Sequence, residues 1–459
     1  MPADLPPAYS ESATAPNDPI VYDAPTSWAV GAKTLARPLV RVGELKAHLA
    51  LLRAFKALRT LVEDGQIAEW PDVVRLLDPS QRWIWFVGLA VDRFQRWIDV
   101  LGSASLGTTL EYELPPLDVV MIWHAYLLNP TWYAEDCLRM APLNPLRGVR
   151  DHLLSALVRI GDVSSFDVSS ERKKLWLRKT GLPYDPISAA TLATTHAVSC
   201  PKCLQNMSVP YILLEGTGYL QSKFRTTCPA CGFHVDRDGL ATLKFVRDLV
   251  LDPRSERDKR RYGNGVYLAG SLRTLIHPCD EIFASALKIK LFVVVPPPEG
   301  NSATVDKDEW IKAIMKQVSY SMETVRKISA PAFSGSERRS ARILSAYFDD
   351  RPFSVELVGA TIRQGSFVDE MQSLSWNDPS RMEGDALLQH AIARYHAFLD
   401  LTASTLSSFF VPTLDIDLAW HTHLMKGEAY QADCSTHIGR FVDHEDKVDE
   451  NRLAAALDD

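Results

Sequence analysis

Apolar positions in the first part of the chain recur at steps of three and four residues, which is the spacing of an amphipathic helix. The residues that carry this pattern first are Leu45, Leu49, Leu52, Phe55, Leu58 and Leu61. The stretch from Trp83 to Leu101 is also apolar, and Arg93, Arg96 and Asp99 are expected to mark its outer face. The pattern predicts helices over roughly 43–140, and a second helical stretch from about 341 to 448.

The middle of the chain follows a different pattern. Residues 232–300 contain continuous apolar runs such as LKIKLFVVV at 287–295, which ends at three consecutive prolines. A short apolar run bounded by a breaker is typical of a β-strand, so a strand is predicted there. A helix is expected around Trp310–Ile328, between two polar segments.

One 24-residue passage occurs twice, 297 positions apart. Residues 114–137 and 411–434 align without a gap and share nine identical residues, including Trp123-His124 with Trp420-His421 and Cys137 with Cys434. The preceding helices also correspond, so each copy is predicted to be a helix, a loop, a helix, a turn and a helix. Two related helical modules in one chain are therefore expected.

Four of the seven cysteines form two CxxC pairs. Cys200 and Cys203 are separated from Cys228 and Cys231 by 24 residues that include β-forming segments. Two such pairs can complete a tetrahedron of thiolates around one Zn²⁺, as in a zinc ribbon. Four thiolates leave no open coordination position, so we predict a structural zinc ion rather than a catalytic one.

Six of the twelve histidines fall within residues 390–444. Asp417 and His421 are four residues apart and should share one face of a helix, where they could bind a metal ion or form an acid–base pair. The candidate catalytic residues in this region are Asp417, His421, His423, His437 and His444. The first copy has Val120 and Tyr126 where the second has Asp417 and His423. The alternative is that the shared Trp, His and Cys residues serve packing only.

Composition and charge narrow the function classes. A chain of 459 residues with 46% hydrophobic and 23% charged residues is long enough for about three globular domains. The net charge of −7 argues against nucleic-acid binding. No apolar stretch reaches the ~18–20 residues of a membrane span. The start MPADLPPAYSES lacks the features of a signal peptide, so we expect a cytoplasmic protein, with the nucleus left open.

The first residues are rich in Pro, Ala, Ser and Asp and are expected to be disordered. They contain Pro6, Pro7 and Tyr9 in a PPxY arrangement, which could fill the groove of a WW domain. The alternative is an accidental match within a Pro-rich tail.

The run PTLDIDLAWHTHL at 412–424, with ARYHAFLDL before it and FVDHEDKV after it, resembles the signature of the glycine-rich domain-containing protein family of plants and fungi. PLDVVMIWHAYLLNP at 116–130 is similar to that family's first, related motif. The resemblance spans most of residues 43–450 and implies no settled biochemical activity. The chain departs from the family in having only 23 glycines and no glycine-rich tract.

The predicted fold is mainly α with a small β zinc ribbon, in which two related helical modules flank a zinc-ribbon-containing middle region. The predicted segments are a disordered Pro-rich tail at 1–32, the first helical module at 33–140, a helical linker at 141–195, the zinc ribbon and α+β middle region at 196–300, a helix and linker at 301–340 and the second helical module at 341–459. Two functions remain open. One is a non-enzymatic scaffold or regulatory interaction protein, and the other is a metal-dependent enzyme, a non-haem iron oxygenase or a hydrolase, with a second metal of unknown identity around Asp417, His421 and His423.

Overall fold

The fold is taken from a computed structural model. It describes residues 25–101, 110, 114–149, 152–164, 167–251, 266–273, 279–294, 306–376, 384–405 and 410–444. Pro6, Pro7 and Tyr9 of the PPxY motif therefore lie outside the described residues. Among the helices that can be examined, none is both long and apolar enough to cross a membrane.

The described residues are mainly helical. The helices of the first half are α1 (Val42–Asp64), α2 (Asp72–Arg75), α3 (Pro79–Asp99), α5 (Leu117–Leu127), α6 (Pro130–Arg139), the 3₁₀ segment η1 (Ala141–Val149), α7 (His152–Ile160), α8 (Ser170–Thr180) and α9 (Pro186–Leu192). Those of the second half are α10 (Arg237–Val250), α12 (Glu281–Val294), α13 (Lys307–Gln317), α14 (Met322–Ser329), the 3₁₀ turn η2 (Ala330–Phe333), α15 (Glu337–Ser345), α16 (Leu357–Leu374), α17 (Gly384–Ser404), α18 (Leu414–Leu424), α19 (Glu428–Asp433) and the π-helical turn η3 (Cys434–Ile438).

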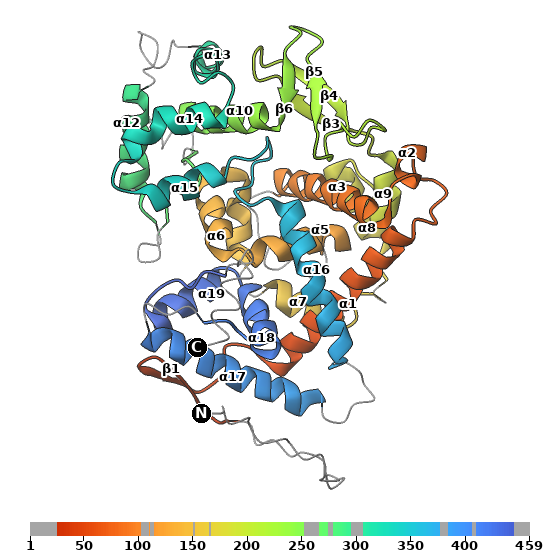
Figure 1. The fold of residues 1–459 in the computed structure, drawn as a ribbon. Coiled ribbons are helices and arrows are strands. Elements are labelled where there is room, and N and C mark those ends of the chain that lie inside the picture. The colour runs from red at the N-terminus through yellow and green to blue at the C-terminus, as the bar shows by residue number, and fades with distance from the viewer. Residues whose placement is uncertain are drawn as a thin grey trace, which may run out of the picture.

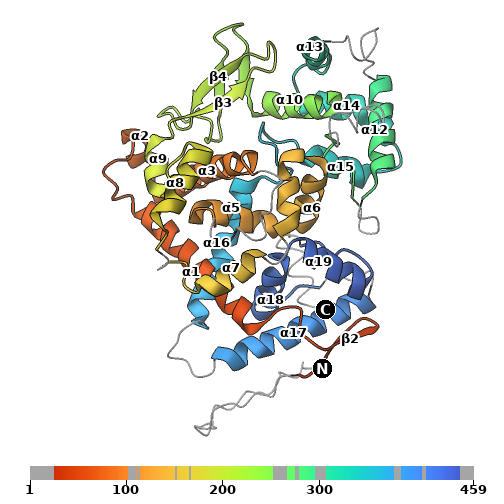
Figure 2. The same cartoon turned by 180° about the vertical axis from the view of Figure 1, so that it is seen from behind.

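Within the described ranges, three antiparallel hairpins supply the β structure. They are β1 (Trp28–Val30) with β2 (Lys33–Leu35), β3 (Thr195–Ser199) with β4 (Asn206–Pro210), and β5 (Arg225–Thr227) with β6 (His234–Asp236). The last two hairpins carry the cysteine pairs at their turns. Figures 1 and 2 show them beside α10 at one end of the molecule, with α17, α18 and α19 at the other.

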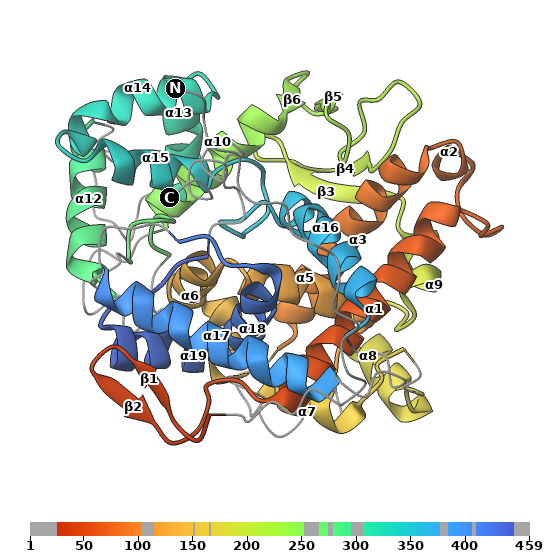
Figure 3. The ribbon, with the colours of Figure 1, turned by 60° about the horizontal axis from the view of Figure 1, so that its bottom comes forward.

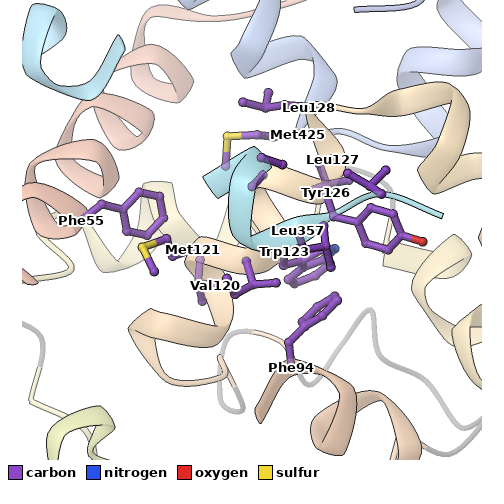
Figure 4. Close-up of a cluster of buried hydrophobic side chains, with 14 of the residues drawn as sticks. Phe55, Phe94, Val120, Met121, Trp123, Tyr126, Leu127, Leu128, Leu357 and Met425 are labelled. Atoms are coloured by element: carbon purple, nitrogen blue, oxygen red, sulfur yellow. The ribbon is translucent and has the colours of Figure 1, made fainter. Parts of the chain in front are cut away.

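Helix α5 lies in the middle of the molecule and is buried on every side. It contacts α1, α3, α6 and α16, so Trp123 and Tyr126 are completely shielded from solvent. Figure 4 shows these two aromatic residues close to Phe94 of α3 and Leu357 of α16. A helix that carries apolar residues on all its faces, as this one does, is expected at the centre of a core rather than at its edge.

The two Trp-His passages make matching contacts. In the first, Trp123 Nε1 donates to the Tyr133 hydroxyl at 3.3 Å, and that hydroxyl donates to the Leu146 carbonyl. In the second, Trp420 Nε1 donates to the Tyr430 hydroxyl at 3.0 Å, which donates to the carbonyl of Val442. Helices α5 and α6 therefore make the same pair of hydrogen bonds as helices α18 and α19.

The ion pair that joins α3 to α5 corresponds to the ion pair that joins α17 to α18. Arg93 Nε lies 2.6 Å from Asp118, and Arg394 Nη1 lies 2.7 Å from Asp415. The prediction that Arg93 marks an outer face of its helix is wrong, because its side chain is buried by this pairing and by the carbonyls of residues 183 and 184. Arg96 and Asp99 are exposed, as predicted.

The β1–β2 hairpin lies against α17, as Figure 3 shows. Its turn is fixed by Gly31, whose amide donates to Asp400 Oδ1 at 2.8 Å and whose φ is +59°. A Cβ at this position would stand 2.6 Å from the carbonyl oxygen of His437, so only glycine fits. The hairpin begins inside the range 1–32 that the sequence analysis assigned to a disordered tail.

The predicted strand at 287–295 is wrong, because α12 runs through this region. Leu287, Lys288 and Leu291 are buried at helical spacing. The Lys288 amine is satisfied there, since Nζ donates to the carbonyl of Asp248 at 2.8 Å. Packing against α10 therefore outweighs the β preference of the Val and Ile residues.

The helix expected around Trp310–Ile328 is divided in two. Helix α13 ends before Ser319 and Tyr320, which have positive φ values of 53° and 58°, and α14 begins after them. Helices α10 and α12–α15 together enclose a second apolar cluster, separate from the large one around α5.

Candidate metal centres and the interface between the two motifs

The four predicted cysteine ligands come together at the tips of the β3–β4 and β5–β6 hairpins. The Cys200 and Cys231 sulfurs lie 3.7 Å apart, as do those of Cys203 and Cys228, and all four lie within 4.8 Å of one another. Sulfurs held at ~2.3 Å from a tetrahedral ion are about 3.8 Å apart. The cluster can therefore hold a metal ion such as zinc, and its geometry is compatible with a zinc ribbon.

The two cysteine turns have the same backbone conformation. Leu204 and Gly232, each directly after the second cysteine of a pair, have φ values of 63° and 69°. Their amides donate to the carbonyls of Cys200 and Cys228, each at 2.9 Å. This repeated turn aims both sulfurs of each pair at one point. At the end of β6, Asp236 caps α10 by accepting from the amide of residue 239.

A partly buried polar network joins the cysteine-bearing hairpins to the helical core. His196 of β3 lies 2.8 Å from Asp92 of α3 and 3.4 Å from Asp350, and its ring stacks on Tyr219 at 3.9 Å. Arg351 completes the network with a 2.9 Å contact to Asp92. Burial alone would lower the pKa of His196, but hydrogen bonds and charges from Asp350 and Asp92 outweigh burial and raise the pKa to about 9. The histidine is therefore a cation that joins the ribbon to α3.

Three of the predicted site residues of the second motif converge. His421 Nε2 lies 3.2 Å from Asp417 Oδ1 and 2.9 Å from His444 Nε2, and the last atom is 3.9 Å from Asp417 Oδ1. Asp417 and His421 lie one turn apart on α18, as predicted, whereas His444 arrives from the segment after η3. Burial would raise the pKa of Asp417, but the nearby His421 and His444 lower it overall, so this carboxylate is ionised.

His423 and His437 lie away from this group. His423 is buried between the Tyr395 hydroxyl at 2.8 Å and Asp433 at 3.0 Å. His437 lies 3.9 Å from the other oxygen of Asp433. In the first motif the Tyr126 hydroxyl contacts Asp136 in the same way that His423 contacts Asp433. His423 therefore occupies the position of a structural tyrosine.

Sequence reasoning missed His48 of α1. Its Nε2 lies 2.9 Å from Nε2 of His124, and its Nδ1 lies 2.9 Å from the Thr422 hydroxyl of α18. Burial lowers the pKa of His124 to about 3, with a further contribution from nearby His421. The signal that could have found His48 is a histidine among the aliphatic residues on the buried face of α1. This histidine links the two Trp-His motifs.

Comparison with known proteins finds one family model that matches part of the second half of the chain. Residues 276–433 match the family model described as "Glycine-rich domain-containing protein-like". This segment contains the second Trp-His motif up to Asp433, but neither the first motif nor the four clustered cysteines.

Two curated relatives come from Arabidopsis thaliana. Glycine-rich domain-containing protein 2 is 28% identical over 169 residues, which are 36% of this chain and 19% of that protein. Glycine-rich domain-containing protein 1 is 35% identical over 107 residues, which are 22% of this chain and 12% of that protein. The chain thus spans about a fifth or less of the length of these relatives. No solved structure matches it. Over residues 276–433 the comparisons confirm the resemblance seen in the sequence, because this segment matches the glycine-rich domain-containing protein-like family.

Proposed function

We propose that this protein is a non-enzymatic scaffold in which two related helical modules are braced by a structural zinc ribbon. The observation that carries the proposal is the convergence of the Cys200, Cys203, Cys228 and Cys231 sulfurs within 4.8 Å. Four thiolates fill the coordination sphere of a tetrahedral zinc ion, so no position remains for substrate or water. An ion held in this way contributes folding energy rather than chemistry.

The matching contacts of the two Trp-His motifs support the view that one helical unit was copied. The Trp–Tyr hydrogen bond, the Arg–Asp ion pair and the contact to the last Asp occur in both motifs at corresponding positions. Such shared residues maintain packing rather than reaction chemistry.

An exposed apolar stripe on α12 favours an interaction role. Ile282, Ile289 and Val293 are 85%, 64% and 78% exposed, and their spacing of seven and four residues puts them on one face of the helix. Exposed aliphatic residues gathered on one face are typical of surfaces that bind another protein.

Zinc removal tests the scaffold proposal. The intact chain is expected to contain zinc with a sulfur-only shell in its X-ray absorption spectrum. Treatment with a strong chelator should increase amide hydrogen exchange across residues 195–236 because the turns lose their shared ion. The double variant Cys228→Ser/Cys231→Ser should reproduce this increase without chelator. A protein that has no sulfur-bound zinc, or keeps its protection after zinc is removed, contradicts the proposal.

The proposed partner of the Pro-rich segment is a WW domain, which recognises polyproline II segments followed by an aromatic residue. Isothermal titration of the full chain with isolated WW domains should give micromolar affinity, of the order of −8 kcal/mol. The change Tyr9→Ala should abolish this binding, while Tyr22→Ala, a tyrosine outside the PPxY arrangement, should leave it unchanged. Equal binding by wild type and Tyr9→Ala would exclude the motif.

A further inference from the structure

Two pairs of histidines meet where the two Trp-His motifs pack together, and the hydrogen-bonding needs of the two pairs differ. In both pairs the Nε2 atoms are 2.9 Å apart. Two imidazole nitrogens at this distance need either a proton or a cation between them, because two lone pairs repel each other. Which of these is present can be inferred from the partners of the other ring nitrogens.

The pair His48–His124 is satisfied by a proton. The Thr422 hydroxyl donates to the Leu418 carbonyl, so it can only accept from His48 Nδ1. His48 Nε2 is then a lone pair, and His124 Nε2–H donates to it. Among the described residues no charged oxygen contacts this pair. The position on α5 that corresponds to Asp417 is occupied by Val120.

The pair His421–His444 contains an additional anionic atom. His444 Nδ1 lies 2.8 Å from the Leu128 carbonyl, which only accepts, so Nδ1 carries a proton and in the neutral ring Nε2 is a lone pair. That lone pair and Asp417 Oδ1 both face His421 Nε2. A single Nε2 proton on His421 cannot satisfy both acceptors, and Asp417 Oδ1 is buried without a hydrogen bond of acceptable geometry.

The three ligand atoms are spaced as a metal ion requires. Ligands at about 2.0–2.1 Å from a tetrahedral ion lie roughly 3.3 Å apart, and the three separations here are 2.9, 3.2 and 3.9 Å. A metal-binding histidine usually donates its second ring nitrogen to a carbonyl or carboxylate, and His444 does this with the Leu128 carbonyl. The side chains of His421 and His444 are 2% and 10% exposed, so both are already held in place.

We propose that Asp417, His421 and His444 form a second metal site, independent of the cysteine cluster, that takes a divalent transition-metal ion. Two imidazoles and one carboxylate suit Zn²⁺ or Fe²⁺, and three protein ligands leave a position for water. Because the ligand His444 also binds the carbonyl of Leu128, at the end of α5, the ion joins the second motif to the first. The proposal goes beyond the scaffold function and does not depend on it.

Metal content and X-ray absorption of the full chain test the site. Protein dialysed against Zn²⁺ and then against metal-free buffer should hold two zinc ions per chain, with both a sulfur shell and a nitrogen/oxygen shell. The near-isosteric double variant Asp417→Asn/His444→Gln should hold one zinc ion, with the sulfur shell alone. The matched control is His124→Gln, the corresponding histidine of the first motif, which should still hold two.

The outcomes separate the two proposals. A wild-type chain with only sulfur-bound zinc overturns the second site, and so does a double variant that keeps the nitrogen/oxygen shell. A chain with only the nitrogen/oxygen shell supports this site while contradicting the zinc ribbon. If the double variant does not fold, the wild-type spectrum alone decides, because the shells of the two sites differ in element. The same measurement after Fe²⁺ loading identifies the preferred metal.

Discussion

Corresponding residues of the two motifs lie in different surroundings, and Asp136 and Asp433 show this most clearly. Asp136 is completely buried and accepts from Arg139 at 2.6 Å and from the amide and hydroxyl of Ser354 at 2.8 and 2.5 Å. The Asp433 side chain is 32% exposed and contacts two histidines. The same residue type therefore anchors a buried network in one copy and a partly solvated pair in the other.

The change Asp136→Ala should lower the free energy of unfolding by about 3–5 kcal/mol, because it leaves Arg139 buried without its nearest carboxylate. The matched change Asp433→Ala should cost about 1 kcal/mol or less, since water can reach that site. Urea denaturation followed by circular dichroism measures both. Equal losses for the two variants would show that burial does not distinguish the copies.

Some of the candidate site could be predicted from local spacing, and some could not. The four-residue interval between Asp417 and His421 predicted their contact, and the two CxxC pairs predicted the cysteine cluster. The approach of His444 and His48 depends on how distant segments pack, which local periodicity does not encode. The prediction that Arg93 lies on an outer face was wrong for the same reason, because tertiary packing brings its partner Asp118 to it.

At the scale of elements, the cysteine-bearing hairpins and α12 show which sequence patterns predict secondary structure correctly. The hairpins were predictable because the cysteine spacing and the β-forming residues indicate the same structure. Helix α12 was not, because a run rich in Val, Ile and Leu fits a buried strand or a buried helix equally well. The burial of Leu287, Lys288 and Leu291 at helical spacing shows that tertiary packing favours the helix.

The attachment of β3 to α3 should depend on pH. The folded pKa of His196 is about 9, above the value of about 6.5 for an unfolded histidine. Its contribution to stability is complete below pH 6.5 and is lost as the pH rises through 9, and a shift of this size corresponds to about 3 kcal/mol. Asp92 and Asp350 have lowered pKa values and stay ionised over this range.

The measurement is the free energy of unfolding at pH 6 and pH 9 for the wild type and for His196→Gln. The wild type should lose more stability than the variant between the two pH values, by up to about 3 kcal/mol. Titration of the cysteine thiols is common to both proteins and cancels in the comparison. An identical pH dependence in the two proteins would mean that His196 is not a cation in the folded state.

At the scale of the molecule, α1 connects parts that are distant in sequence. It packs against α3, α5 and α7 of the first half and against α16, α17 and α18 of the second. Its Lys56 pairs with Asp369 of α16, and its Glu44 lies 3.1 Å from Lys426. The mainly helical composition could be predicted from sequence, whereas this long-range role of one helix could not, because an amphipathic pattern does not specify what covers its apolar face.

The span of α1 has a practical consequence for anyone who isolates the family region. A fragment cut at residues 276 and 433 would leave behind α1, the hairpin that rests on α17, and His444. The apolar faces of α16, α17 and α18 would then be exposed to solvent. We therefore expect such a fragment to be insoluble or to be bound by chaperones. Expression that begins before Trp28 and continues beyond His444 keeps these faces covered.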